Sequence, residues 1–148
     1  MDRMLGNRKF LAGQYKEAIP FLENAVGKHP EDGLAIKKLI LSYLATKQLP
    51  RALPYFFDLL QADNPLIAKS CHEDYPDFER EIFLMLNSEI KARLNETEQN
   101  LAAGMLATFF DCQLAHSFFQ RAYNLDPENE STKKIISLLN LKTKYNLK

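Results

Sequence analysis

The chain of 148 residues lacks tryptophan, contains only two cysteines and five glycines, and carries no net charge, because 19 basic side chains balance 19 acidic ones. Two cysteines are too few for a disulfide scaffold. A neutral charge argues against binding to nucleic acid or an anionic membrane through bulk charge. No apolar run approaches a membrane span, and the first residues lack the apolar core of a signal peptide. We therefore expect a cytoplasmic protein that binds neither nucleic acid nor membrane.

β-branched residues are also scarce, with one valine, eight isoleucines and five threonines against 23 leucines and 14 alanines. β-branched side chains lose rotamer freedom in helices and favour strands. No segment alternates apolar and polar residues long enough to predict a sheet. Hydrophobic residues make up 46% of the chain, which is enough for a core. The composition predicts an all-α protein of single-domain size.

A repeat of 34 residues runs through the N-terminal part of the chain. The triplet Ala-Ile-Pro at residues 18–20 returns as Ala-Leu-Pro at residues 52–54. Each triplet follows a turn signal, near Gly13 in the first copy and near Lys47 in the second. Proline is rare inside helices, and its missing N–H costs less early in a helix. The spacing therefore predicts two helix–turn–helix units.

A third copy lies near the C-terminus, where Ala115 follows Ala52 by 63 residues. That interval equals one repeat of 34 and a shortened one of 29, so residues 66–95 are predicted to form a degenerate copy. We expect its pair to turn at Tyr75-Pro76, and the next pair at Phe110-Asp111. A terminal helix should follow, with lysines outward and these apolar residues over the last pair: Ile135, Ile136, Leu138, Leu139 and Leu141.

This pattern resembles the tetratricopeptide repeat (TPR) family, whose unit is a 34-residue helix–turn–helix. The resemblance implies a right-handed solenoid in a single domain, with repeats at residues 1–32, 33–65, 66–95 and 96–129 and a capping helix at 130–145. The first copy departs from the family at Asp2, where tryptophan is preferred. It matches the family at Leu5, Gly6, Gly13, Tyr15, Ala18, Leu22, Ala25 and Pro30.

In TPR-like stacks the first helix of each pair lines a concave groove in which peptides bind. The resemblance therefore implies a groove that is basic toward one edge and apolar toward the other, suited to a peptide with an acidic residue near a large apolar one. The alternative is that Phe10, Leu41 and Leu44 only pack against neighbouring helices. The predicted groove residues are Arg3, Asn7, Phe10, Lys37, Lys38, Leu41 and Leu44.

Some TPR domains clamp the acidic C-terminal tail of heat-shock chaperones with a basic residue and an asparagine four residues later. Arg3 and Asn7 match that pair. The family pattern then requires asparagine at Lys38 and basic residues at Thr97 and Leu101, which this chain lacks. We therefore do not expect the chain to bind such tails.

Zinc is the one cofactor that the sequence raises. Four residues could supply the ligands of a tetrahedral zinc ion, namely Cys71-His72 and Cys112 with His116. Cys112, however, occupies the repeat position of Tyr15, and cysteine is commonly buried as a small hydrophobe. We therefore expect neither metal nor cofactor.

No catalytic motif is present either. The carboxylate neighbours are expected to cap and solvate helix ends: Glu31-Asp32, Glu73-Asp74 and Glu96/Glu98.

Together these features predict a protein–protein interaction module, a scaffold or adaptor without catalysis, whose partner is another protein or a peptide segment. The alternatives are a small helical secretion-type chaperone, a zinc-binding helical protein or a regulatory part of a larger enzyme. The first repeat begins about three residues into its first helix, without a capping segment. Either the chain is a piece of a longer protein or this end meets a partner, which includes self-association with a second copy.

Overall fold

The computed structural model describes residues 2–61, 83–86, 88, 94–109 and 111–146, with the backbone alone for residues 112 and 140–146. Its described elements are all helices, which confirms the all-α prediction. Among these helices, none combines the length and the apolar character that crossing a membrane requires. The chain groups into two compact units, residues 1–59 and 60–148. A single continuous domain stays a prediction.

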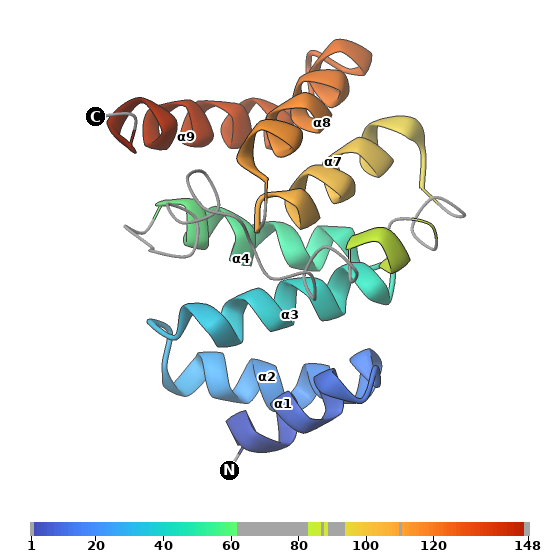
Figure 1. Cartoon of the computed structure of the whole chain (residues 1–148), viewed down its shortest axis with the longest axis vertical. Coiled ribbons are helices and arrows are strands. Elements are labelled where there is room, and N and C mark those ends of the chain that lie inside the picture. Colours follow the sequence, from blue (N-terminus) through green and yellow to red (C-terminus); the bar gives the residue numbers. More distant parts are fainter. Residues whose placement is uncertain (1, 62–82, 87, 89–93, 110, 147–148) are drawn as a thin grey trace. The chain divides into compact units, whose positions relative to one another are not determined.

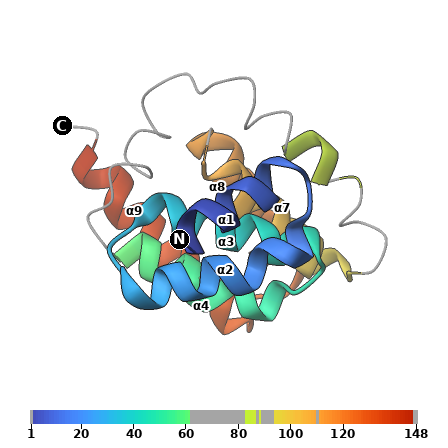
Figure 2. The same cartoon turned by 90° about the horizontal axis from the view of Figure 1, so that it is seen from below.

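The first unit contains two helix–turn–helix pairs, α1 (Asp2–Leu11) with α2 (Tyr15–Lys28) and α3 (Gly33–Ala45) with α4 (Leu49–Gln61). Figure 1 shows α2, α3 and α4 in successive layers, and Figure 2 shows the same pairs from below. The helix bounds follow the 34-residue period, because Tyr15 and Leu49 begin the second helix of each pair.

Both predicted turns are present, and each uses a left-handed residue to end a helix. Gly13 has φ +78° and Lys47 has φ +62°. In the first turn the N–H of Gln14 donates to the carbonyl of Lys9 at 2.9 Å, and in the second the N–H of Gln48 donates to Tyr43 at 2.8 Å. These bonds are those of a Schellman motif, which satisfies carbonyls that the helix end would otherwise leave unpaired.

Small residues allow the helices of the first unit to approach closely. Ala18 and Ala52, which share one repeat position, are fully buried. A Cβ added at Gly6 would lie 2.9 Å from the side chain of Leu22, so α1 and α2 approach each other more closely there than a side chain allows. The small residues Gly6 and Ala18 thus allow the close approach of the helices.

A polar network around the buried Tyr43 connects α2, α3 and α4. Tyr43 is 1% exposed, and its hydroxyl donates to the carboxylate of Glu23. Arg51 donates to the same carboxylate at 2.8 Å, and its guanidinium lies 5.0 Å from the centre of the Tyr43 ring. Tyr55 stacks on that ring at 5.9 Å. The network satisfies the one polar atom that Tyr43 brings into the core.

The second unit contains α7 (Glu96–Ala107), α8 (Cys112–Leu125) and α9 (Glu130–Asn146), with α8 in contact with both others. Side-chain caps begin all three helices. Asn95 and Glu98 form a capping box for α7, Asp111 accepts from Leu114 N–H at 3.0 Å, and Asn129 accepts from Thr132 N–H at 2.9 Å. The predicted turn at Tyr75-Pro76 and the carboxylates Glu73-Asp74 lie outside the described residues.

The first and last pairs share one register, in which each residue of α2 corresponds to the residue of α8 that follows it by 97 positions. Both helices have 14 residues. Ala115 and Phe119 are fully buried, like their counterparts Ala18 and Leu22. The close approach in the last pair is at Gly104, where an added Cβ would lie 2.5 Å from the Phe119 ring. This glycine stands one residue beyond the position of Gly6, so sequence alignment alone did not assign it that role.

The terminal helix α9 has the predicted amphipathic pattern. Ile135 and Leu139 are fully buried, whereas Lys133 and Lys134 are exposed. Ile136 and Leu138 are half-buried, and Leu141 lies in the segment whose side chains are not described. The apolar stripe of α9 therefore packs on α8, as expected of a terminal helix.

Candidate functional site

The polar members of the predicted groove lie together on α1 and α3. Nζ of Lys38 donates to Oδ1 of Asn7 at 2.9 Å. Nε of Arg3 lies 3.1 Å from Oδ2 of Asp32, and the Arg3 side chain is 59% exposed. Asp32 also accepts from Ala35 N–H at 3.2 Å, so its carboxylate both caps α3 and holds Arg3. The structure thus brings Arg3, Asn7 and Lys38 onto one accessible surface.

Neighbouring cations affect Lys38 more strongly than the nearby carboxylate of Asp32 does. Partial burial lowers the pKa of Lys38, and the charges of Arg3 and Lys37 lower it further, whereas Asp32 opposes the change. A lowered lysine pKa means that the surroundings disfavour the protonated form. A carboxylate placed beside Lys38 and Arg3 would reduce that repulsion, so the cluster is suited to an acidic ligand group.

The apolar members of the predicted groove are buried. Phe10 is 3% exposed, Leu41 is 5% exposed and Leu44 is 2% exposed. Phe10 packs edge-on against Tyr15, with ring centres 5.4 Å apart. Lys37 is also buried, at 6% exposure. The helical spacing that places these residues on one face is present, but the face is accessible only at Arg3, Asn7 and Lys38.

The reason is the position of α3 in the first unit. Nine of its 13 residues are buried, so α3 is enclosed around most of its circumference. A helix that is apolar on all sides is typical of the interior of a helical stack. The alternative interpretation, that the leucines pack against neighbouring helices, agrees with this burial.

A hollow of about 530 Å³ lies beside the cluster, at the open end of the first pair. Its walls are charged. Nζ of Lys28 lies 3.2 Å from Oδ2 of Asp2, and Nδ1 of His29 lies 3.4 Å from Oε1 of Glu31. Together with the pair of Arg3 and Asp32, the pair of Lys28 and Asp2 places opposite charges side by side in the walls of the hollow.

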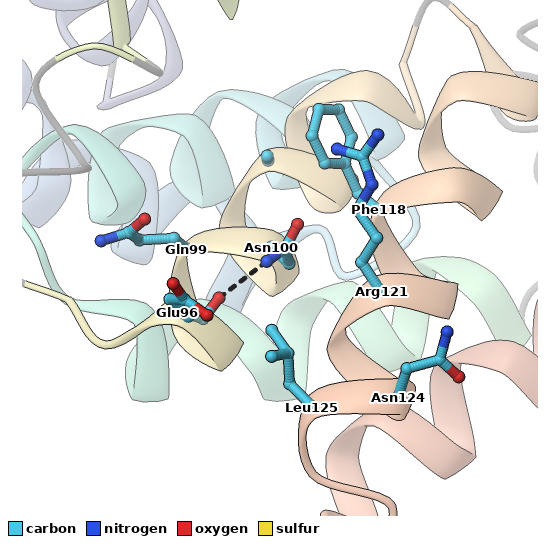
Figure 3. Close-up of a pocket in the computed structure, with 8 residues that line it drawn as sticks. Glu96, Gln99, Asn100, Phe118, Arg121, Asn124 and Leu125 are labelled. Carbon is cyan, nitrogen blue, oxygen red and sulfur yellow. Dashed lines mark hydrogen bonds between the residues drawn. The ribbon is translucent and has the colours of Figure 1, made fainter.

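A larger pocket of about 660 Å³ lies at the corresponding place in the last pair, between α7 and α8. Figure 3 shows its α7 wall, with Glu96, Gln99 and Asn100, and its α8 wall, with Phe118, Arg121 and Leu125. Nδ2 of Asn100 donates to the backbone carbonyl of Glu96 at 2.8 Å. The sequence analysis assigned no role to this pocket.

An aromatic pair and a cation form one end of this pocket. The guanidinium carbon of Arg121 lies 5.6 Å from the centre of the Phe118 ring. Phe118 in turn lies 6.1 Å from Phe83, which is 7% exposed. Phe83 therefore fixes the ring, and the ring holds the guanidinium by a cation–π contact. The i, i+3 spacing of Phe118 and Arg121 places them on one helix face, a signal that was present in the sequence.

The structure describes no side-chain set of a metal centre. Within the described residues, no three histidine, cysteine, aspartate or glutamate side chains gather as ligands of one ion. Cys71-His72 lies outside that part of the chain, and the side chain of Cys112 is not described. The predicted absence of metal and cofactor stays a prediction.

Comparison with known proteins gives one family. The family model of the tetratricopeptide repeat matches residues 9–68, which include most of the first unit. The comparisons with curated proteins and with solved structures find no match. The matched segment contains the turns at Gly13 and Lys47 and the buried residues Ala18 and Ala52, which follow the 34-residue period. The segment of residues 9–68 is therefore identified as tetratricopeptide repeat sequence.

Proposed function

We propose that the chain is a scaffold or adaptor that holds an acidic segment of another protein on the exposed faces of α1 and α3, without catalysis. Tetratricopeptide repeats are in general protein–protein interaction modules. The observation that carries the proposal is the cluster of Arg3, Asn7 and Lys38, in which Arg3 pairs with Asp32, Lys38 donates to Asn7, and burial and the charge of Arg3 lower the pKa of Lys38.

Each polar member has a separate role in this proposal. Lys38 and Arg3 attract a carboxylate of the partner, and Asn7 holds the Lys38 ammonium in place through the bond at 2.9 Å. Phe10, Leu41 and Leu44 support the surface from beneath, because their burial keeps them from direct contact. Exposed charge pairs contribute only about 0–1 kcal/mol each, so the cluster sets selectivity and association rate more than affinity.

The test begins with a partner identified by copurification and mass spectrometry, followed by titration calorimetry of the purified pair. Lys38→Gln and Arg3→Gln should each weaken binding about two- to fivefold, and the loss should shrink at high salt. Lys16→Gln removes the same charge from an exposed site on α2 and serves as the control. Unchanged affinity in both cluster variants would move the functional surface elsewhere.

A further inference from the structure

We propose that the pocket between α7 and α8 is a second binding site, for an extended peptide segment with an acidic side chain next to an apolar one. This inference goes beyond the proposed function, which places binding on α1 and α3. It depends on three features of the pocket, which are a preoriented cation, an apolar floor and an amide acceptor.

The cation is Arg121. Its side chain is exposed and lies over the Phe118 ring at 5.6 Å, and no carboxylate within the described ranges pairs with it. The ring contact restricts the guanidinium but leaves its N–H groups available to solvent. A planar guanidinium held in this way binds a carboxylate through two parallel hydrogen bonds. Arg121 therefore selects an aspartate, a glutamate or another carboxylate.

The apolar floor consists of Ala103, Phe118 and Leu125. Leu125 is 48% exposed and lines the cavity, so its side chain presents apolar surface there. A volume of about 660 Å³ lies within the usual range for sites that enclose a small ligand. A leucine-sized side chain seated against Leu125 and Phe118 would remove apolar surface from water on both partners.

The α7 wall adds the polar contact that a peptide backbone requires. Because Nδ2 of Asn100 donates to the carbonyl of Glu96, its amide is fixed with the oxygen directed away from that bond (Figure 3). This oxygen can accept from a backbone N–H of the ligand. Glu96 lies toward the Leu125 end of the pocket, away from Phe118 (Figure 3). Its charge repels an acidic residue there and so favours one peptide direction.

In the first helix pair, the hollow that corresponds to this pocket is occupied by side chains of the chain itself. Asp2 and Lys28, which pair across the first hollow at 3.2 Å, correspond to Gln99 and Leu125 in the last pair. The first hollow is thus crossed by its own ion pair. The last pair has neutral residues at both positions and an exposed arginine that pairs with no carboxylate among the described residues, so it can bind a carboxylate from outside.

The experiment uses the full chain labelled with nitrogen-15 and two capped heptapeptides, with leucine–glutamate–leucine or leucine–glutamine–leucine at the centre. Titration should shift the amide resonances of residues 96–103 and 118–125. The glutamine peptide should bind about two- to fivefold more weakly, as expected for one exposed charge pair. Arg121→Gln should abolish the difference between the peptides, whereas Lys16→Gln, a matched loss of charge on α2, should preserve it.

A second variant tests the pocket without removing Arg121. Gln99→Asp combined with Leu125→Lys introduces the ion pair of the first repeat and should abolish the shifts while thermal unfolding stays near that of the parent. Shifts confined to α1 and α3 would overturn this proposal and leave the proposed function standing. In Lys38→Gln, the amide shifts of α1 and α3 should be lost while those of the pocket are retained. This result would show that the two surfaces bind independently. No shift at either surface at millimolar peptide would overturn the second site.

Discussion

The first and last helix pairs of this chain have the same backbone register but close the space between their helices with different chemistry. In the first pair the missing side chain of Gly6 leaves room for Leu22, and the ion pair of Asp2 and Lys28 crosses the open end. In the last pair Gly104 admits the larger Phe119, and the open end remains a pocket. The side-chain volumes at the contact therefore determine how closely the two helices of a pair cross. The residues at the open end beside the crossing can differ between the pairs, and in the last pair they form a pocket that could bind a ligand.

The buried alanine position should give the largest effect common to both pairs. Ala18→Leu and Ala115→Leu should each destabilise the protein by about 1–3 kcal/mol, because both sites are fully buried at helix crossings. Ala52→Leu should behave in the same way. Chemical denaturation measures the loss, and Gln120→Leu on the exposed face of α8 is the control. If all three variants unfolded at the same denaturant concentration as the parent, the shared register would be wrong.

Alanine substitutions at the two glycines should change the stability of the protein by different amounts. Gly104→Ala should destabilise by about 1–2 kcal/mol, because the new methyl group would lie 2.5 Å from a buried aromatic ring that cannot move easily. Gly6→Ala should destabilise less than Gly104→Ala, because the new methyl group would lie 2.9 Å rather than 2.5 Å from its nearest neighbour, the Leu22 side chain, and alanine raises helix propensity by about 1 kcal/mol, which offsets part of the clash.

Gly27→Ala gives the propensity gain alone, because nothing lies within 4 Å of its added Cβ. This control should therefore be more stable than the parent by up to about 1 kcal/mol in the same denaturation experiment. Equal losses at Gly6 and Gly104 would show that the two crossings are equally rigid.

The network around Glu23 should distinguish α2 from α8, since the counterpart of Glu23 is the exposed Gln120. Tyr43→Phe should destabilise by about 1–2 kcal/mol through loss of a hydrogen bond to a charged acceptor. Burial and Glu23 raise the pKa of Tyr43. A raised folded pKa contributes stability below the ordinary tyrosine value of about 10, and this stability is lost as the pH rises through the folded pKa.

Tyr43→Phe should therefore remove the alkaline loss of stability as well as the hydrogen bond. Thermal unfolding followed from pH 8 upward measures both effects. Gln120→Ala should leave the profile unchanged. A parent-like alkaline profile in Tyr43→Phe would contradict the assigned role of the hydroxyl.

The smallest effect should come from Lys38. Its folded pKa is lowered, so the unfolded chain binds the proton more tightly, and stability should rise with pH between the folded pKa and the ordinary value of about 10.5. Lys38→Gln should remove this rise, which is expected to be under about 1 kcal/mol because the site is only partly buried. The Tyr43→Phe background keeps the tyrosine from titrating in the same range. If the rise in stability with pH persisted in Lys38→Gln, another titrating group would be responsible for it.

The sequence predicted those features that follow from local chemistry and repeat spacing. Gly13 and Lys47 fell at the turns, and Asp32 and Glu98 at helix caps, because turn and cap preferences are set by a few adjacent residues. The burial of Leu41 was only one of two alternatives, because helical spacing defines a face but not the neighbour that covers it. The Glu23 network and the α7–α8 pocket were missed for the same reason, since both join residues distant in sequence.

The lysine at the second turn has a further consequence for anyone who engineers this scaffold. Lys47 adopts φ +62°, a conformation that costs most residues about 1 kcal/mol and costs glycine almost nothing. The first repeat already has glycine at its equivalent turn. Lys47→Gly should therefore raise the melting temperature without altering either proposed binding surface, which makes this turn a suitable starting point for a thermostable version of the protein.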